Sequence, residues 1–158
     1  MVSPLVYFDS CIWIAMIKAE QRDELDPAIL PNLAEALDEE KIKVLSSALI
    51  IAECLECNFD DKQNEIFTDI FNNQEKVRLP DPDRNIMELS AEIRSFYKAK
   101  GIKAPATPDA IHLATAIYYN CDEFFTLDKN NKADGSGLLN LETPIADKYN
   151  LKICLPHN

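Results

Sequence analysis

The sequence is poor in glycine, in histidine and in positive charge, and each shortage narrows the class of protein. Three of its 158 residues are Gly and two are His, and no unit of roughly 20 to 50 residues recurs along it. Collagen-like, repeat and disordered architectures are therefore excluded, and the 47% of hydrophobic residues is typical of a globular chain. A chain of this length can bury about 68–70% of its unfolded surface, so we expect one domain over residues 1–158.

Positive charge is scarce. Lysine and arginine number 16 against 27 aspartates and glutamates, which gives a formal net charge of −11. Proteins that adhere to nucleic acids or to anionic membranes normally place Lys and Arg against phosphates, and this chain is a poor passive binder of either. If it acts on nucleic acid, a metal ion or a basic partner protein must supply the missing positive charge.

A basic leader and long hydrophobic runs are also missing. The segment MVSPLVYFDS carries no Lys or Arg and already contains Asp9, and no apolar run approaches the ~20 residues that span a bilayer. We therefore expect a cytoplasmic protein with no membrane partner.

The five cysteines, an odd number for a secreted disulfide framework, have apolar neighbours that suit buried thiols: Cys11, Cys54, Cys57, Cys121 and Cys154. Cys54 and Cys57 form a C-x-x-C without a second Cys or His pair to complete a zinc site, so we interpret them as two thiols on one helix.

Short apolar runs alternate with longer segments of helical periodicity. The runs predict strands at residues 4–8, 42–47, 76–80, 122–128 and 151–156. The periodic segments predict helices at residues 10–20, 26–41, 47–58, 81–101 and 106–120, and a further helical face is predicted from Ile66, Phe67, Ile70 and Phe71. Strands that alternate with helices in this way favour an α/β domain with a mainly parallel sheet covered by helices.

Several residues predict where the helices begin and end. Ser10 and Thr107 are expected to cap two helices, with Pro108 in the first turn of the second. Gly101 is expected to end the long helix, and Pro31 to delay the start of another. The segment KNNKADGSG, residues 129–137, is expected to be a polar loop.

Four acids are placed so that they can meet at one edge of the sheet. Asp9 and Asp128 follow strands, Asp109 lies in the first turn of a helix, and Glu53 lies inside an apolar helical run. Ligands of parallel sheets bind outside the carboxyl ends of the strands. Carboxylates gathered there raise one another's pKa values unless a divalent cation lies between them. Oxygen ligands suit Mg²⁺ or Mn²⁺, so the pattern indicates metal-assisted hydrolysis of a phosphodiester.

Each acid also has a structural alternative. Asp109 can complement the helix dipole, Asp128 can form an Asx-turn, and Asp9 can cap a helix with Ser10 inside its first turn. Glu53 is harder to explain by structure alone, because an unpaired buried carboxylate is costly, although a salt-bridge partner distant in the sequence would remove that cost.

Three segments, taken together, point to a family. VYFDSCIWI, SSALIIAECLE and TPDAIHLATAIYYNCDEFFTLDKN, in this order and at these spacings, resemble the acidic motifs of PIN-domain ribonucleases, the fold of VapC-type toxins. The third is the most specific: an Asp opens an Ala-rich helix, and a strand then leads to Thr-x-Asp. The resemblance spans residues 5 to about 154 and implies a three-layer α/β/α domain with a mainly parallel central sheet of about five strands.

The resemblance implies a metal-dependent endoribonuclease that hydrolyses RNA. Its catalytic and metal-holding residues would be Asp9, Glu53, Asp109 and Asp128, with Mg²⁺ or Mn²⁺ as cofactor. Ser10 and Thr126 match hydroxyl residues that position the acids or the substrate. One departure is Cys11, where many relatives have Asn, and this leaves the orientation of Asp9 open. Asn130, Asn131 and Asp134 can reach the site from the loop, although solvated loop residues explain them as well.

RNA contact, partners and the histidines complete the expectations. The densest positive stretch is the candidate for RNA backbone contact, with a solvated helix face as the alternative: Arg94, Lys98, Lys100 and Lys103. The resemblance to the toxins implies a homodimer and an antitoxin that blocks the site with a basic residue. His112 is expected to be a core residue and His157 to lie at a frayed end, so neither is needed as a nucleophile.

Two other functions compete with the nuclease. A haloacid-dehalogenase-type phosphatase also places an Asp after its first strand, but it needs a second Asp two residues later, where this chain has Cys11. A catalytically silent PIN-fold module would use the acidic cleft to bind a basic protein. The departure at Cys11 favours this module, whereas the presence of all four acids opposes it.

Overall fold

The computed structural model describes residues 2–128 and 137–158, and within them the strands form a single parallel sheet. The strands are β1 (Leu5–Phe8), β2 (Lys43–Leu45), β3 (Val77–Arg78), β4 (Glu123–Phe125) and β5 (Lys152–Cys154). Their order across the sheet is β3-β2-β1-β4-β5, and all four pairings are parallel. The first strand is therefore central, and its carboxyl end leads into Asp9.

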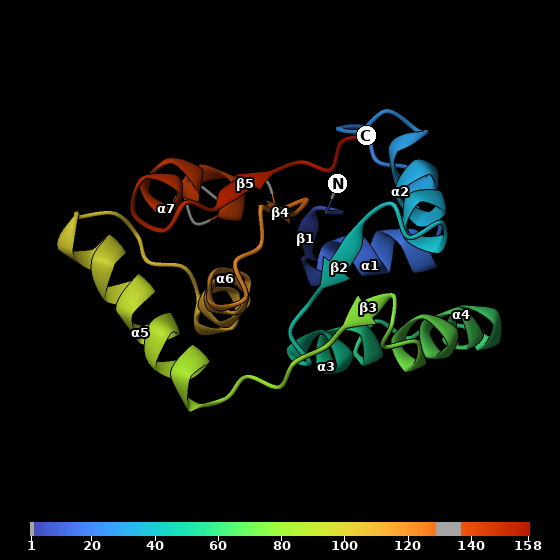
Figure 1. The fold of residues 1–158 in the computed structure, drawn as a ribbon, viewed down its shortest axis with the longest axis horizontal. Helices are drawn as coiled ribbons and strands as arrows, with labels where there is room; N and C mark the ends of the chain where they lie inside the picture. Colours follow the sequence, from blue (N-terminus) through green and yellow to red (C-terminus); the bar gives the residue numbers. More distant parts are fainter. Residues whose placement is uncertain (1, 129–136) are drawn as a thin grey trace.

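Helices cover both faces of this sheet. They are α1 (Ser10–Ile17), α2 (Ile29–Asp38), α3 (Leu49–Leu55), α4 (Asp61–Asn72), α5 (Arg84–Ala99), α6 (Thr107–Tyr118) and α7 (Glu142–Tyr149), with a 3₁₀ turn at Leu138–Leu141. In Figure 1, α1 to α4 gather on one side of the strands and α5 to α7 on the other. The predicted three-layer α/β fold with five parallel strands is confirmed.

Successive side chains of β1 point alternately into two buried clusters, one on each face of the sheet. Val6 and Phe8 pack into one buried cluster with α1, α2 and Phe71 of α4, whereas Tyr7 packs into the other with residues of α5 and α6. Successive side chains of a strand point to opposite faces, so both layers meet through this single strand. Tyr7 also lies level with Leu45 of β2 and Phe124 of β4.

A pair of hydrogen bonds fixes the carboxyl end of β1 from the side of α1. The Trp13 indole N–H donates to Ser46 Oγ at 2.8 Å, and the Ser46 hydroxyl donates to the Phe8 carbonyl at 2.6 Å. All three residues are buried. Since Asp9 follows Phe8 and its own N–H donates to the Phe125 carbonyl at 3.1 Å, the backbone that carries this acid is held from two directions.

The helix starts differ from three sequence predictions. Asp9, rather than Ser10, is the N-cap of α1, which was the alternative for this acid. Ala106, rather than Thr107, precedes α6, so Thr107 is the first helical residue. Pro31 does not delay α2, which begins at Ile29 and holds the proline in its first turn, where its missing N–H costs nothing. Gly101 ends α5 as predicted, with a positive φ of 71°.

The C-terminal third contains elements that the sequence patterns missed. The 3₁₀ turn and α7 were not predicted, and both pack against the α5 and α6 layer through Leu138, Leu141 and Ile145. On α4, Phe71 is buried as expected, but Ile66 remains exposed. The predicted polar loop lies outside the described residues except for Gly137, as do the candidates Asn130, Asn131 and Asp134. Among the helices that the structure describes, none is both long and apolar enough to cross a membrane.

Candidate functional site

Asp9 is a buried carboxylate with a bonded partner on each oxygen. Its Oδ1 accepts from the Ser10 backbone N–H at 2.8 Å, and its Oδ2 accepts from the Thr126 hydroxyl at 2.8 Å. Burial raises the pKa of Asp9, and the opposing effects of nearby His112 and of the two hydrogen bonds compensate only in part. Ser10 thus contacts the acid through its backbone, and Thr126 contacts it through its side chain.

Cys11 occupies the position at which the chain departs from many relatives, and it supports Asp9. Its thiol donates to Asp9 Oδ2 at 3.5 Å, and its sulfur accepts from the Leu127 N–H at 3.2 Å. Burial and the adjacent Asp9 charge raise the pKa of this thiol far above its usual value, so Cys11 stays neutral and is a poor nucleophile. The departure therefore preserves a small hydrogen-bonding group beside the first acid.

Glu53 belongs to a hydrogen-bonded chain that reaches into the core. Its Oε2 lies 2.8 Å from His112 Nε2, and His112 Nδ1 lies 2.6 Å from the Tyr7 hydroxyl. The Tyr7 oxygen accepts from the Ser47 backbone N–H at 2.8 Å, so its own proton is directed at His112 Nδ1. In the neutral ring Nε2 then carries the proton that Glu53 accepts.

His112 is the functional candidate that sequence reasoning missed. It is fully buried, as expected of a core residue, but its Nε2 also lies 4.0 Å from Asp9 Oδ1 and so joins two of the predicted acids. Burial lowers its pKa, but the bond to Glu53 and the charges of Asp9, Glu53 and Asp109 outweigh this and raise it overall. The only local sign of this role in the sequence is that His112 is an ionisable residue three positions after Asp109, in a helix whose following residues are mostly apolar.

The expectation that Glu53 is deeply buried is wrong, although the distant partner considered for it exists. Its side chain is 28% exposed, and its neighbours on α3, Ile51 and Leu55, are 37% and 58% exposed. The helix α3 is short and packs mainly through Ile50 and Cys54. Glu53 therefore stands at the rim of the site with His112 beneath it.

Asp109 is subject to the negative charge of the three other acids. It lies half-buried in the first turn of α6. Its pKa is raised to about 6, first by burial and then by the charges of Asp9, Asp128 and Glu53, and His112 offsets this only in part. The helix dipole alone would favour the ionised form. Negative charge from three other acids therefore reaches this carboxylate.

Asp128 lies three residues beyond β4 and has a structural contact as well. Its N–H donates to Thr126 Oγ1 at 3.1 Å, and its Oδ2 accepts from the Leu138 N–H at 3.1 Å. The second bond reaches across ten residues to the start of the 3₁₀ turn. The Asx-turn considered from the sequence would join Asp128 to Asn130, which lies outside the described residues. Thr126 thus contacts both Asp9 and Asp128.

The chemistry of these residues fits a hard divalent cation. The donors are carboxylate oxygens, and the raised pKa values of Asp9 and Asp109 are those expected of acids that lack a positive charge between them. Across residues 2–128 and 137–158, no three of the four acids offer oxygens within 4.8 Å of one another. Mg²⁺ commonly keeps several waters and needs only one or two direct carboxylate bonds, so a looser arrangement suits it.

The predicted RNA-contacting residues lie near the end of α5 and beyond it. Arg94 Nε donates to the Pro105 carbonyl at 2.9 Å and so ties α5 to the segment that precedes Asp109. Lys100 lies over the Phe96 ring, with Nζ 5.1 Å from its centroid. Lys98 and Lys103 are exposed. One nitrogen of Arg94 is thus bonded within the protein, and contact of all four residues with RNA stays a prediction.

Comparisons with known proteins agree with this architecture. The fold is similar to VapBC2 from Rickettsia felis bound to a DNA fragment from its promoter, at 16% identity and a TM-score of 0.62, over 97% of this chain and 99% of the other. It is also similar to FitAcB from Neisseria gonorrhoeae (21% identity, TM-score 0.56, 78% and 87% covered) and to a toxin–antitoxin complex from Klebsiella pneumoniae (22%, 0.53, 88% and 97%). No curated protein matches the sequence.

The family itself is shown by the sequence match. The PIN domain model matches residues 6–133, a range that begins within β1, contains β2 to β4, and includes Asp9, Glu53, Asp109 and Asp128. The resemblance inferred from the three acidic segments is thereby confirmed: the chain belongs to the PIN domain family.

Proposed function

We propose that the protein is a metal-dependent endoribonuclease of the PIN family and the toxin of a toxin–antitoxin pair. The observation that carries the proposal is the arrangement in which Thr126 contacts both Asp9 and Asp128, while His112 links Asp9 to Glu53. The pKa of Asp109, raised to about 6 by burial and by the charges of the three other acids, agrees with it. Such a cluster is unfavourable for folding, and it becomes favourable when a cation is bound. The PIN family assignment also argues against the haloacid-dehalogenase-type phosphatase.

The four acids share one task in this proposal, and neighbouring residues support them. Asp9, Glu53, Asp109 and Asp128 would hold Mg²⁺ or Mn²⁺, which when bound activates water and stabilises negative charge on the scissile phosphate. Thr126 orients Asp9 and the backbone of Asp128, and Ser10 holds the other oxygen of Asp9. The RNA backbone would be contacted by Arg94, Lys98, Lys100 and Lys103. A cytoplasmic location, where RNA is accessible, is part of the proposal.

His112 acts through Glu53 rather than on the substrate. It is fully buried and bonded on both ring nitrogens, to Tyr7 and to Glu53, so it cannot reach a phosphate without breaking this chain. A partner that fixes a metal-binding carboxylate typically affects metal affinity or activity by about 10–100-fold. We assign His112 as a positioning residue.

An antitoxin and a second copy of the chain are the proposed protein partners. Ile51 and Leu55 are exposed on the same helix as Glu53, so an apolar segment could pack there while a basic side chain enters the acidic site. The net charge of −11 favours a basic partner. One of the similar structures is itself a toxin–antitoxin complex. The homodimer can be tested by light scattering.

Cleavage of defined RNAs tests the nuclease. Purified protein is incubated with single-stranded and hairpin RNAs in Mg²⁺, Mn²⁺ or EDTA, beside Asp9→Asn, Asp109→Asn and the charge-matched control Asp69→Asn on the exposed face of α4. We expect cleavage with either metal, none in EDTA, and a loss only in the first two variants. Cleavage that persists in EDTA or in both site variants would overturn the metal mechanism.

The same proteins test the silent binding module. If no RNA is cut under any condition, a basic peptide is titrated against the wild type and the site variants by calorimetry. Binding that is lost in Asp9→Asn and Asp109→Asn but kept in Asp69→Asn would replace the nuclease with a PIN-fold module that binds a basic protein.

A further inference from the structure

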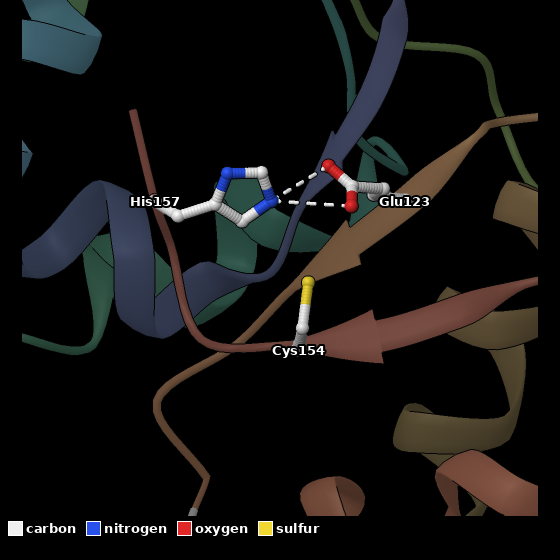
Figure 2. A group of neighbouring side chains, drawn as sticks. All are labelled: Glu123, Cys154 and His157. Atoms are coloured by element: carbon white, nitrogen blue, oxygen red, sulfur yellow. Dashed lines mark hydrogen bonds and ion pairs between the residues drawn. The ribbon is translucent and has the colours of Figure 1, made fainter.

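A second group of ligand-type side chains lies on the face of the sheet, among residues that the carboxylate site does not use. Glu123 begins β4, Cys154 ends β5, and His157 lies in the segment that follows β5. One ligand atom from each, a carboxylate oxygen, Sγ and a ring nitrogen, lies within 4.8 Å of the others. Figure 2 shows the imidazole facing the Glu123 carboxylate, with the thiol directed toward both.

We propose that Glu123, Cys154 and His157 bind a Zn²⁺ ion that fastens the segment after β5 to the sheet. Zinc accepts nitrogen, sulfur and oxygen ligands together, whereas Mg²⁺ and Mn²⁺ prefer oxygen alone. Zinc–ligand bonds of about 2.0–2.3 Å in a tetrahedron put ligand atoms roughly 3.3–3.7 Å apart. His157 Nε2 and Glu123 Oε2 lie 2.9 Å apart and would separate slightly, while Cys154 Sγ would approach them by at most about 1.5 Å, and a fourth position remains for water.

The imidazole is already oriented for metal binding. His157 Nδ1 lies 3.1 Å from the Asn158 backbone oxygen, while Nε2 lies 2.9 and 3.1 Å from the two Glu123 oxygens. Histidine ligands usually donate the other ring N–H to a carbonyl or a carboxylate, as Nδ1 does here. The ring also packs edge-on against Phe125, with centroids 5.1 Å apart. Zinc would replace the proton on Nε2.

The carboxylate has a supporting partner that leaves one oxygen for the ion. Lys152 Nζ lies 2.8 Å from Glu123 Oε1, and Oε2 is the oxygen nearer to His157. Ligating carboxylates are themselves commonly hydrogen-bonded, so Lys152 would support Glu123 without displacing it as a ligand. An opening of about 570 Å³ adjoins the group, lined by Glu123, Phe125 and His157 together with residues of α2, and gives an ion an entry path.

The ion would stabilise an edge of the sheet. Within the described sheet β5 pairs only with β4 and stands at the end of the strand order. A bridge between Glu123 on β4, Cys154 on β5 and His157 beyond them would link all three segments. An ion that binds only the folded chain raises its stability by mass action. This proposal does not depend on the nuclease.

Cobalt(II) is the probe, because a cobalt–thiolate bond gives a charge-transfer band that oxygen ligands cannot produce. The full chain is stripped with chelator and titrated with Co²⁺. Wild type is compared with Cys154→Ser, His157→Ala and two thiol controls, Cys11→Ser beside the carboxylate site and Cys54→Ala/Cys57→Ala at the end of α3 and in the turn that follows it. We expect the band in wild type and both controls, its loss in Cys154→Ser, and displacement by Zn²⁺. Cobalt affinity should fall by about 100-fold or more in His157→Ala, because a ligand itself is lost and loss of a ligand's supporting partner already costs about 10–100-fold.

Several results would overturn the proposed zinc site. A band that survives in Cys154→Ser, or that vanishes in either thiol control, overturns the assignment, and so does the absence of a band in wild type. If Cys154→Ser fails to fold by circular dichroism, His157→Ala decides instead, since that side chain is 49% exposed and its loss does not threaten the core. An unchanged affinity for cobalt in His157→Ala overturns the site.

Discussion

Asp109 and Glu123 are both half-buried acids beside the same sheet, yet their surroundings are opposite. Around Asp109, burial and the charges of Asp9, Asp128 and Glu53 raise the pKa to about 6. Around Glu123, burial alone would raise the pKa, but hydrogen bonds from Lys152 and His157 bring it below its usual value. The fold thus balances charge at Glu123 and leaves it unbalanced at Asp109. Charge that folding leaves unbalanced indicates a site that binds something else.

The largest effect is expected where the imbalance is greatest. Asp109→Asn should lower RNA cleavage by about 100-fold or more in single-turnover assays, because a charged metal ligand is lost. The same change should raise the urea midpoint of the metal-free protein at pH 7.5, since it removes a repelled charge. A variant that loses both activity and metal-free stability would show that Asp109 has a structural role instead.

A smaller effect on cleavage is expected from the chain that supports Glu53. His112→Leu should lower cleavage by about 10-fold and destabilise the protein by about 1–3 kcal/mol, because the Tyr7 hydroxyl loses its acceptor in the core. Urea unfolding and single-turnover cleavage measure the two effects.

Two isosteres of His112 separate positioning from packing. In His112→Gln the amide can reach toward Glu53, whereas in His112→Asn it can reach only toward Tyr7. Cleavage should recover more fully in the Gln variant. Equal recovery in both would mean that the imidazole fills space and does not orient Glu53.

The raised pKa of Asp109 also predicts that the stability of the metal-free protein depends on pH. In the folded protein the carboxyl keeps its proton up to a pH of about 6, while in the unfolded chain it loses it near its ordinary pKa of 3.8. Between these values the folded state binds more protons, so the stability of the metal-free protein should fall as the pH rises from about 4 to about 6.

Urea midpoints measured in EDTA across this pH range test the prediction. The difference between Asp109→Asn and wild type should be small near pH 4, grow through pH 6 and then level off. In saturating Mg²⁺ this difference in urea midpoint should no longer increase with pH. A constant difference from pH 4 to pH 8 would contradict the elevated pKa.

The smallest effect is expected at the balanced acid. In metal-free protein, Glu123→Gln should cost about 0.2–1 kcal/mol by urea unfolding, since its partners Lys152 and His157 are 56% and 49% exposed and exposed ion pairs contribute little. A loss several times larger would show that this group holds the sheet edge even without an ion.

The sequence was most informative where one local pattern determined the structure. Short apolar runs predicted all five strands, and their alternation with helices predicted the parallel sheet. Local reasoning failed at boundaries: Asp9 and Ser10 can both cap a helix, and only the geometry at the end of β1 selects Asp9. The 3₁₀ turn and α7 were missed because GLLNLETPIADKYN is short and its Pro144 interrupts the pattern.

The candidate site shows the same division. Thr126 lies beside Asp9 and Asp128, as their spacing in the motif suggested, because a strand end and a helix start bring them together. The role of His112 could not be read from its neighbours, since its partners Glu53 and Tyr7 lie 59 and 105 residues away in the chain. A bond between such distant residues follows from the packing of two layers, which no local pattern encodes.

The Trp13 hydrogen bond gives the protein an intrinsic optical reporter. Trp13 is the only tryptophan in the chain, it is fully buried, and through Ser46 it is linked to the Phe8 carbonyl, one residue before Asp9. Its emission should shift to longer wavelength when the chain unfolds, and it should respond to small displacements of the backbone that carries the first acid. Occupancy of the carboxylate site can therefore be followed by Trp13 fluorescence in the unlabelled wild-type protein. The emission of each variant before and after metal is added can be compared in the same way.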